Sequence, residues 1–197
     1  MFSNIIRHVF KHLFHVPIIS HLLKLSDNIM IGAIYGSFLS QNYEDSLQFS
    51  LYGLKRKRKN NNRHSHDTWW EFMKYAIKSA LKVYKREYYE ELRKLAINGP
   101  KPIEGREIAQ SLIELSALGY SFRDKKDMSQ LVELAELAGS ADSSWGEPDF
   151  ILGWYKLPNN EAILHFKKAI NKDPSYKSRV MHDSTCNKYP EIIAQIR

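Results

Sequence analysis

Apolar side chains recur along most of this chain with the spacing of α-helices. Over residues 2–15 they follow the i, i+3, i+4, i+7 rule, and the opposite face carries Arg7, Lys11 and three histidines. Apolar spacing, apolar runs and residues that favour helix starts together predict helices over 18–25, 29–39, 43–58, 68–97, 108–118, 128–138, 148–157, 160–171 and 191–196. Alternation with a period of two does not persist outside loops. We therefore expect an all-α protein.

The longest predicted helix begins and ends at recognisable signals. Thr68 and Glu71 have the spacing of a capping box, and Asn98-Gly99-Pro100 ends the helix. A helix of this length is unusual in a globular domain, so a kink near Arg86 is expected. Its apolar positions predict one buried stripe: Met73, Ile77, Ala80, Tyr84, Tyr88, Leu92 and Leu95.

Lys101-Pro102 is the best candidate for a boundary within the chain. It separates an N-terminal helical region, residues 1–98 with a basic loop at 55–67, from a C-terminal helical region, residues 102–197. We expect the two regions to form one continuous folded unit.

The segment 149–176 has small, aromatic and proline residues at characteristic positions. Leu152-Gly153 lies in the first predicted helix, and Ala162, Phe166, Ala169 and Pro174 follow at spacings of four, three and five. In this respect the segment resembles a tetratricopeptide repeat, a family of paired antiparallel helices that stack into solenoids. The turn, Leu157-Pro158-Asn159-Asn160, is about three residues shorter than is usual in the family. The resemblance implies a close helix pair at 149–171.

A weaker echo of that pattern lies in the predicted helix 43–58, where Ser46, Ser50 and Gly53 are small and Ser50 replaces the aromatic residue. A single repeat cannot bury both of its faces, so stacked neighbours are needed. We expect a degenerate, solenoid-like helical repeat of antiparallel helix pairs. An irregular helical bundle is the second choice.

The formal net charge of +7 is concentrated in two segments. Residues 1–26 carry three basic and no acidic residues, and 55–66 carry six basic residues and no acidic one. The remainder is slightly acidic, so the chain has no generally basic surface.

The sequence also bears on the compartment. Cys186 is the single cysteine, which excludes an intrachain disulfide and favours a reducing compartment. The longest apolar stretch, 29–39, is well short of the roughly 20 residues that span a bilayer. We expect a cytoplasmic protein without a transmembrane segment, free or peripheral to a membrane.

Sequence motifs for the common catalytic sites are missing from the chain, so we expect no enzyme activity, no cofactor and no metal site. His182 and Cys186 are four residues apart, the spacing at which a histidine can activate a thiol, but no clear helix is predicted there. The favoured function is binding to another protein, as a scaffold, an adaptor or an immunity-type partner. Its candidate anchors are aromatic residues, which dominate binding hot spots: Trp145, Trp154 and Tyr155.

The alternative function is binding to an anionic surface, either nucleic acid or membrane. The predicted helix 2–15 is basic and amphipathic, a pattern found in helices that lie in a membrane interface. The run of basic residues at 55–59 could bind phosphates. The candidate residues are Arg7, Lys11, Lys55, Arg56, Lys57, Arg58, Lys59 and Arg63.

Overall fold

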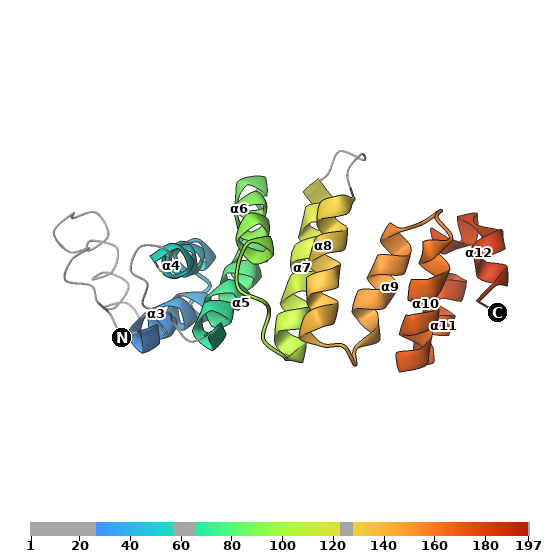
Figure 1. Ribbon diagram of the computed structural model, residues 1–197. Coiled ribbons are helices and arrows are strands. Elements are labelled where there is room, and N and C mark those ends of the chain that lie inside the picture. The colour runs from blue at the N-terminus through green and yellow to red at the C-terminus, as the bar shows by residue number, and fades with distance from the viewer. Residues whose placement is uncertain (1–26, 57–65, 123–127, 197) are drawn as a thin grey trace. The chain divides into compact units, whose positions relative to one another are not determined.

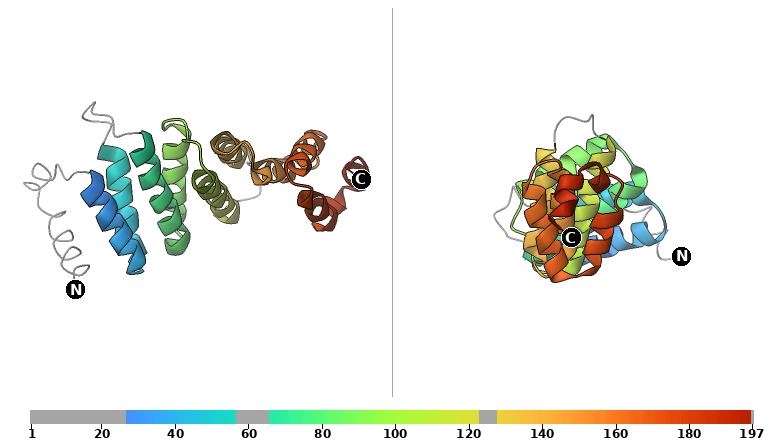
Figure 2. Two further views of the ribbon diagram at one scale, coloured as in Figure 1. Left: turned by 90° about the horizontal axis from the view of Figure 1, so that it is seen from below. Right: turned by 90° about the vertical axis from the view of Figure 1, so that its right-hand side faces the viewer.

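The computed structural model describes residues 27–56, 66–122 and 128–196. The regular structure in these ranges is helical, without a strand, so the all-α prediction is confirmed. The chain divides into two compact units, Met1–Ala96 and Ile97–Arg197. Figures 1 and 2 show their helices coloured in chain order. The helices predicted over 2–15 and 18–25 lie outside the described residues.

In the first unit the described helices are α3 (Asp27–Leu39), α4 (Tyr43–Arg56), α5 (His66–Val83) and α6 (Arg86–Ile97). Helix α4 packs closely on both α3 and α5, which also touch each other. Helix α6 contacts α4 through polar side chains, including a hydrogen bond of 3.0 Å from Gln48 Nε2 to Tyr88 Oη. Adjacent helices thus pack in pairs.

The small side chains of α4 explain how closely its neighbours approach. Ser46 Oγ donates a hydrogen bond to the Ile34 carbonyl of α3 at 3.2 Å, and Ser79 of α5 donates to Ser46 Oγ at 3.0 Å. A Cβ atom on Gly53 would lie 2.9 Å from the Phe72 ring of α5, which is closer than real Cβ contacts. Because the residues on this face of α4 are small, α3 and α5 approach it closely and bury it.

The predicted stripe over 68–97 is interrupted. Tyr84 has a left-handed φ of 54°, so α5 ends at Val83 and a separate helix begins at Arg86. The break changes which side chains face inward: Tyr89, Leu92 and Ala96 are buried in α6, whereas Tyr84 is exposed. The expected kink is thus a break, and the prediction of one continuous buried stripe is wrong.

Three predicted helix ends also differ from the structure. Helix α5 begins at His66, so Thr68 lies in its first turn and is not its N-cap. The helices predicted to end at residues 118 and 138, before Gly119 and Gly139, continue to Phe122 and Ala141. A glycine inside a helix costs about 1 kcal/mol relative to alanine, and the burial of neighbouring side chains offsets that cost.

The second unit contains α7 (Arg106–Phe122), α8 (Ser129–Ala141), α9 (Gly146–Tyr155), α10 (Glu161–Lys172) and α11 (Ser175–His182). A short 3₁₀ helix, η2 (Cys186–Lys188), and α12 (Pro190–Ala194) follow. Helices α7 and α8 pack side by side, as do α9 and α10, and α8 contacts α9 (Figure 1). Helix α11 was not among the helices that the sequence predicts.

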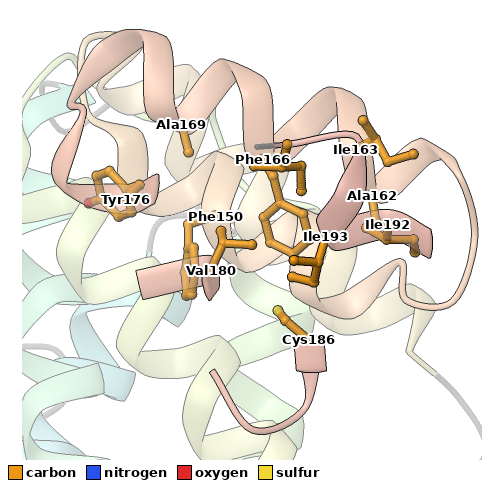
Figure 3. Close-up of a cluster of buried hydrophobic side chains, with 11 residues drawn as sticks. Phe150, Ala162, Ile163, Phe166, Ala169, Tyr176, Val180, Cys186, Ile192 and Ile193 are labelled. Carbon is orange, nitrogen blue, oxygen red and sulfur yellow. The ribbon is translucent and has the colours of Figure 1, made fainter. Parts of the chain in front are cut away.

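The pair α9 and α10 is held together by a close approach of small residues to an aromatic ring. A Cβ on Gly153 would lie 2.7 Å from the Phe166 ring, which is fully buried. Ala162 and Ala169 are also fully buried, as the repeat pattern predicts. Phe166 belongs to an apolar cluster to which α9, α10, α11, η2 and α12 contribute (Figure 3). The close helix pair expected at 149–171 is therefore present.

Candidate functional site

Three aromatic rings meet in the second unit, and we call them the aromatic cluster: Tyr120 of α7 with Trp154 and Tyr155 of α9. The Tyr120 and Trp154 rings make an edge-to-face contact with centroids 5.1 Å apart. Tyr120 stacks on Tyr155 at 6.3 Å, and Trp154 meets Tyr155 at 5.7 Å. These separations are typical of favourable aromatic pairs. The cluster joins residues from two helices that are far apart in sequence.

A buried chain of hydrogen bonds holds the base of the aromatic cluster. Ser116 Oγ donates to the Leu131 carbonyl of α8 at 3.1 Å and lies 3.0 Å from the Tyr155 hydroxyl. Because the single hydroxyl proton of Ser116 is used on Leu131, the Tyr155 O–H donates to Ser116. Ser116 is fully buried, so these bonds form away from water and fix α9 against α7 and α8.

The members of the cluster differ in their access to solvent. Tyr120 is 41% exposed and Trp154 is partly buried, whereas Tyr155 is only 7% exposed. The sequence suggested Tyr155 as an exposed anchor, but it is buried and packs against the other two rings. Trp154 and Tyr120 form the part of the cluster that a partner could reach.

Trp145 lies outside the aromatic cluster. It precedes the first residue of α9, whereas Trp154 lies in the last turn of that helix, and nine residues of helix span roughly 14 Å. The Arg106 guanidinium lies over the Trp145 ring at 4.8 Å, and Arg106 Nε donates to Asp142 at 2.6 Å. The structure therefore does not gather the three predicted anchors into one site.

Acidic side chains at the start of α9 are bound by cations from α10 and α11. Asp149 accepts a hydrogen bond of 2.5 Å from Lys172, and His165 Nδ1 lies 3.5 Å from its other oxygen. Burial by itself would raise the pKa of Asp149, but His165 and Lys172 outweigh it and hold that pKa below its ordinary value. Glu147 pairs with Arg179 of α11, whose guanidinium also covers the Phe150 ring at 4.2 Å. These contacts tie three helices together.

The Cys186 thiol is placed as a core side chain. It is 1% exposed, and burial, followed by the charge of Asp183, raises its pKa to about 12. A thiol with so high a pKa is a poor nucleophile at neutral pH. The His182 ring already has a partner within α11, since its Nδ1 lies 2.8 Å from the Ser178 carbonyl.

The residues proposed for an anionic surface are described only in part. Lys55 is exposed and pairs with Glu91 of α6. Arg56 is the last residue of α4, and its side chain is not described. The remaining candidates lie outside the described residues: Arg7, Lys11, Lys57, Arg58, Lys59 and Arg63.

Tyr120 is the member of the cluster that sequence reasoning missed. The predicted helix ended before Gly119, so Tyr120 was not assigned to the face of a helix. The signal that could have found it is its spacing of four from Ser116, which places both side chains on one face of α7.

The described ranges, 27–56, 66–122 and 128–196, also bear on metal binding and membrane spanning. Within them, no three His, Cys, Asp or Glu residues are grouped so that they could hold a metal ion. None of the helices described is both long and apolar enough to cross a bilayer. In the comparisons with known proteins, no family model matches the chain and no curated protein is significantly similar to it.

Proposed function

We propose that this protein is a non-enzymatic helical module that binds another protein through Tyr120 and Trp154. The observation that carries the proposal is the edge contact of 5.1 Å between these two rings, which belong to different helices. Tyr120 is 41% exposed, and Trp154 is partly buried. Tryptophan and tyrosine supply large contact areas at a low entropic cost, and they dominate binding hot spots. A partner would therefore meet two rings that are already held in position.

The packing around the aromatic cluster supports this role. Tyr155, Ser116 and the Leu131 carbonyl form a buried, hydrogen-bonded support next to Tyr120 and Trp154. Partner surfaces that are ordered before binding lose less conformational freedom when the complex forms. A rigid aromatic pair is what a scaffold, an adaptor or an immunity-type protein would present.

The finer proposal is that the α9–α10 pair is a degenerate tetratricopeptide-like repeat. The approach of Gly153 to Phe166 and the burial of Ala162 and Ala169 support it. Helical repeats stack into surfaces that bind peptides and partner helices. The one cysteine that could have acted as a nucleophile is a core residue, which favours binding over catalysis.

The test is affinity capture from an extract of the organism that encodes the chain. Wild type is compared with Tyr120→Ser, Trp154→Phe and a control, Leu164→Ser, which alters an exposed apolar residue of α10 outside the cluster. We expect wild type and the control to retain the same protein. Tyr120→Ser should weaken its binding about tenfold, because truncating a hot-spot ring costs roughly 1–2 kcal/mol.

Two results would contradict the proposal. Equal retention by wild type, Tyr120→Ser and Trp154→Phe would exclude this surface as the binding site. Failure to retain any protein reproducibly would exclude the binding function itself. Circular dichroism of each variant shows that any loss of binding is not a loss of folding.

A further inference from the structure

Cationic and aromatic side chains of α5 and α3 lie together on one side of the first unit. Tyr75, Lys78 and Lys82 follow one another at spacings of three and four along α5, so they share one face of that helix. Tyr35 of α3 borders this face, because its ring makes an edge contact with the Tyr75 ring at a centroid distance of 6.0 Å. We call these four residues the Lys–Tyr surface.

The two lysines of this surface have no neutralising partner within the described part of the chain. Lys82 is exposed and Lys78 is partly exposed, and no ion pair joins either of them to a carboxylate there. Lys74 differs from them, since it is buried and its Nζ lies 2.8 Å from a Glu71 oxygen. Lys78 and Lys82 can therefore offer their ammonium groups to an anion from outside.

The sequence around these lysines is basic throughout. Residues 72–86 contain five basic residues and no acidic one, whereas residues 87–94 contain three acidic and two basic residues. Lys78 and Lys82 are about 6 Å apart along the helix axis. A row of cations with so short a repeat is complementary to a ligand whose negative charges also repeat at short intervals. Nucleic acids are such ligands, because each nucleotide carries one phosphate charge.

Tyr35 adds an aromatic ring on which a base can stack. It is 48% exposed, so much of its side chain is open to solvent. The Tyr75 ring against it is itself packed edge-on against Phe38 of α3, at a centroid distance of 6.0 Å. Aromatic rings bind unpaired bases by stacking, and every base has a face that can stack. An exposed ring beside unpaired cations is the combination that proteins use to bind single strands.

We propose that the Lys–Tyr surface binds single-stranded nucleic acid, with a base stacked on Tyr35 and neighbouring phosphates bound by Lys78 and Lys82. Stacking does not depend on the identity of the base, so binding should tolerate different sequences. The lysines bind phosphates as point charges, so added salt should weaken the complex. The inference concerns the first unit and is independent of the protein-binding role proposed for the second.

An unpaired base distinguishes this ligand from other polyanions. A double helix keeps its bases stacked inside, and an acidic protein segment carries charges without bases, so neither would use the Tyr35 ring in this way. Binding should therefore depend on both the ring and the two lysines.

The first test concerns the lysines. Fluorescence anisotropy measures binding of the full chain to a labelled oligothymidine of about 20 nucleotides at several salt concentrations. The variant Lys78→Gln with Lys82→Gln should weaken binding and lower the slope of log affinity against log salt by about 1.4, because each phosphate contact on a single strand contributes about 0.7. The control, Lys167→Gln with Lys168→Gln, removes two exposed lysines of the other unit and should bind like wild type.

The second test concerns the ring. Tyr35→Ser should weaken binding of the oligothymidine about tenfold, because it removes the stacking surface. Tyr35→Phe keeps the ring and should bind like wild type. An abasic strand of the same length has the phosphates without the bases, so wild type and Tyr35→Ser should bind it equally.

Four results would overturn the proposal: no binding at low salt, normal binding by the variant of Lys78 and Lys82, equal weakening in the control variant, or equal binding of the oligothymidine by wild type and Tyr35→Ser. Polyglutamate or phosphatidylglycerol vesicles that compete as well as unlabelled oligothymidine would also overturn it, because the ligand would then be an acidic protein segment or a membrane. The altered side chains lie at the surface, so the variants should fold, and circular dichroism verifies this.

Discussion

Asp142 links the end of α8 to the beginning of α7 through hydrogen bonds made by one carboxylate. It accepts bonds from the backbone N–H and the hydroxyl of Ser144, at 3.1 and 2.6 Å, and one of 2.6 Å from Arg106. The Ser144 hydroxyl, followed by Arg106, lowers the pKa of Asp142 to about 2. The ionised form is therefore the one that the folded protein stabilises.

The stabilisation by Asp142 should depend on pH with a definite sign. The folded pKa lies below the ordinary value of 3.8, so the contribution is complete above about pH 4 and is lost as the pH falls toward 2. Asp142→Asn should lower the free energy of unfolding by about 1 kcal/mol near neutral pH, because the pair with Arg106 is partly exposed. Urea denaturation of both proteins at several pH values measures this. A difference that persists unchanged at pH 2 would contradict the assignment.

Helices α4 and α9 use the same packing device, although they belong to different units. Each places a glycine against an aromatic ring of the next helix, Gly53 against Phe72 and Gly153 against Phe166. The close approach leaves no room for a methyl group. Gly32 of α3 lies equally within a helix but faces open space. The chain thus contains helical glycines with and without a packing role.

Replacing Gly153 and Gly32 by alanine should change the free energy of unfolding in opposite directions. Gly153→Ala should lower the free energy of unfolding by about 2 kcal/mol, because its Cβ would lie 2.7 Å from the Phe166 ring. Gly32→Ala should raise it by about 0.5–1 kcal/mol, since alanine is the better helix former. Thermal and urea denaturation provide the measurement. Equal effects of the two substitutions would show that helix propensity, and not the contact with Phe166, decides the outcome.

Helices of the second unit differ in how many of their residues are buried. In the second unit α9 packs on α8 and α10, and most of its residues are buried. Helix α12 has only five residues and contacts η2. Local stability follows the number of buried contacts, so the helices of one molecule should open at different rates.

Amide hydrogen exchange should reflect this difference. We expect the amides of α9 and α10 to exchange slowest in the second unit and those of α12 to exchange much faster. Mass spectrometry of peptic fragments compares 146–172 with 190–194 in the same sample, so each serves as the control for the other. Equal protection of the two segments would mean that the unit opens in a single step.

Much of the fold could be predicted from local signals. Helices α3, α9 and α10 lie close to the predicted ranges 29–39, 148–157 and 160–171, and α6 ends directly before Asn98-Gly99-Pro100. Asn42 directly precedes α4, with Gln41 in a left-handed turn at φ 59°. Such signals act over a few residues, so the sequence carries them directly.

The errors arose where a contact between helices overrides a local preference. Glycine often ends a helix, yet both helices continue past Gly119 and Gly139, because packing of their side chains stabilises the extra turn. The break at Tyr84 changes the buried face of the following helix, which no fixed period can anticipate. Periodicity describes one face of one helix, whereas its neighbours determine where that helix stops.

The sequence by itself determined an all-α chain and a close pair of helices at 149–171, because apolar spacing and small residues act within one element. The tertiary structure decided which aromatic residues meet: Tyr155 is buried, Trp145 lies under Arg106, and Tyr120 joins Trp154. It also decided that Ile29 and Leu39 of α3 remain exposed. The physical reason is that burial depends on which surfaces of distant segments cover each other, and a pattern along one helix does not contain that information.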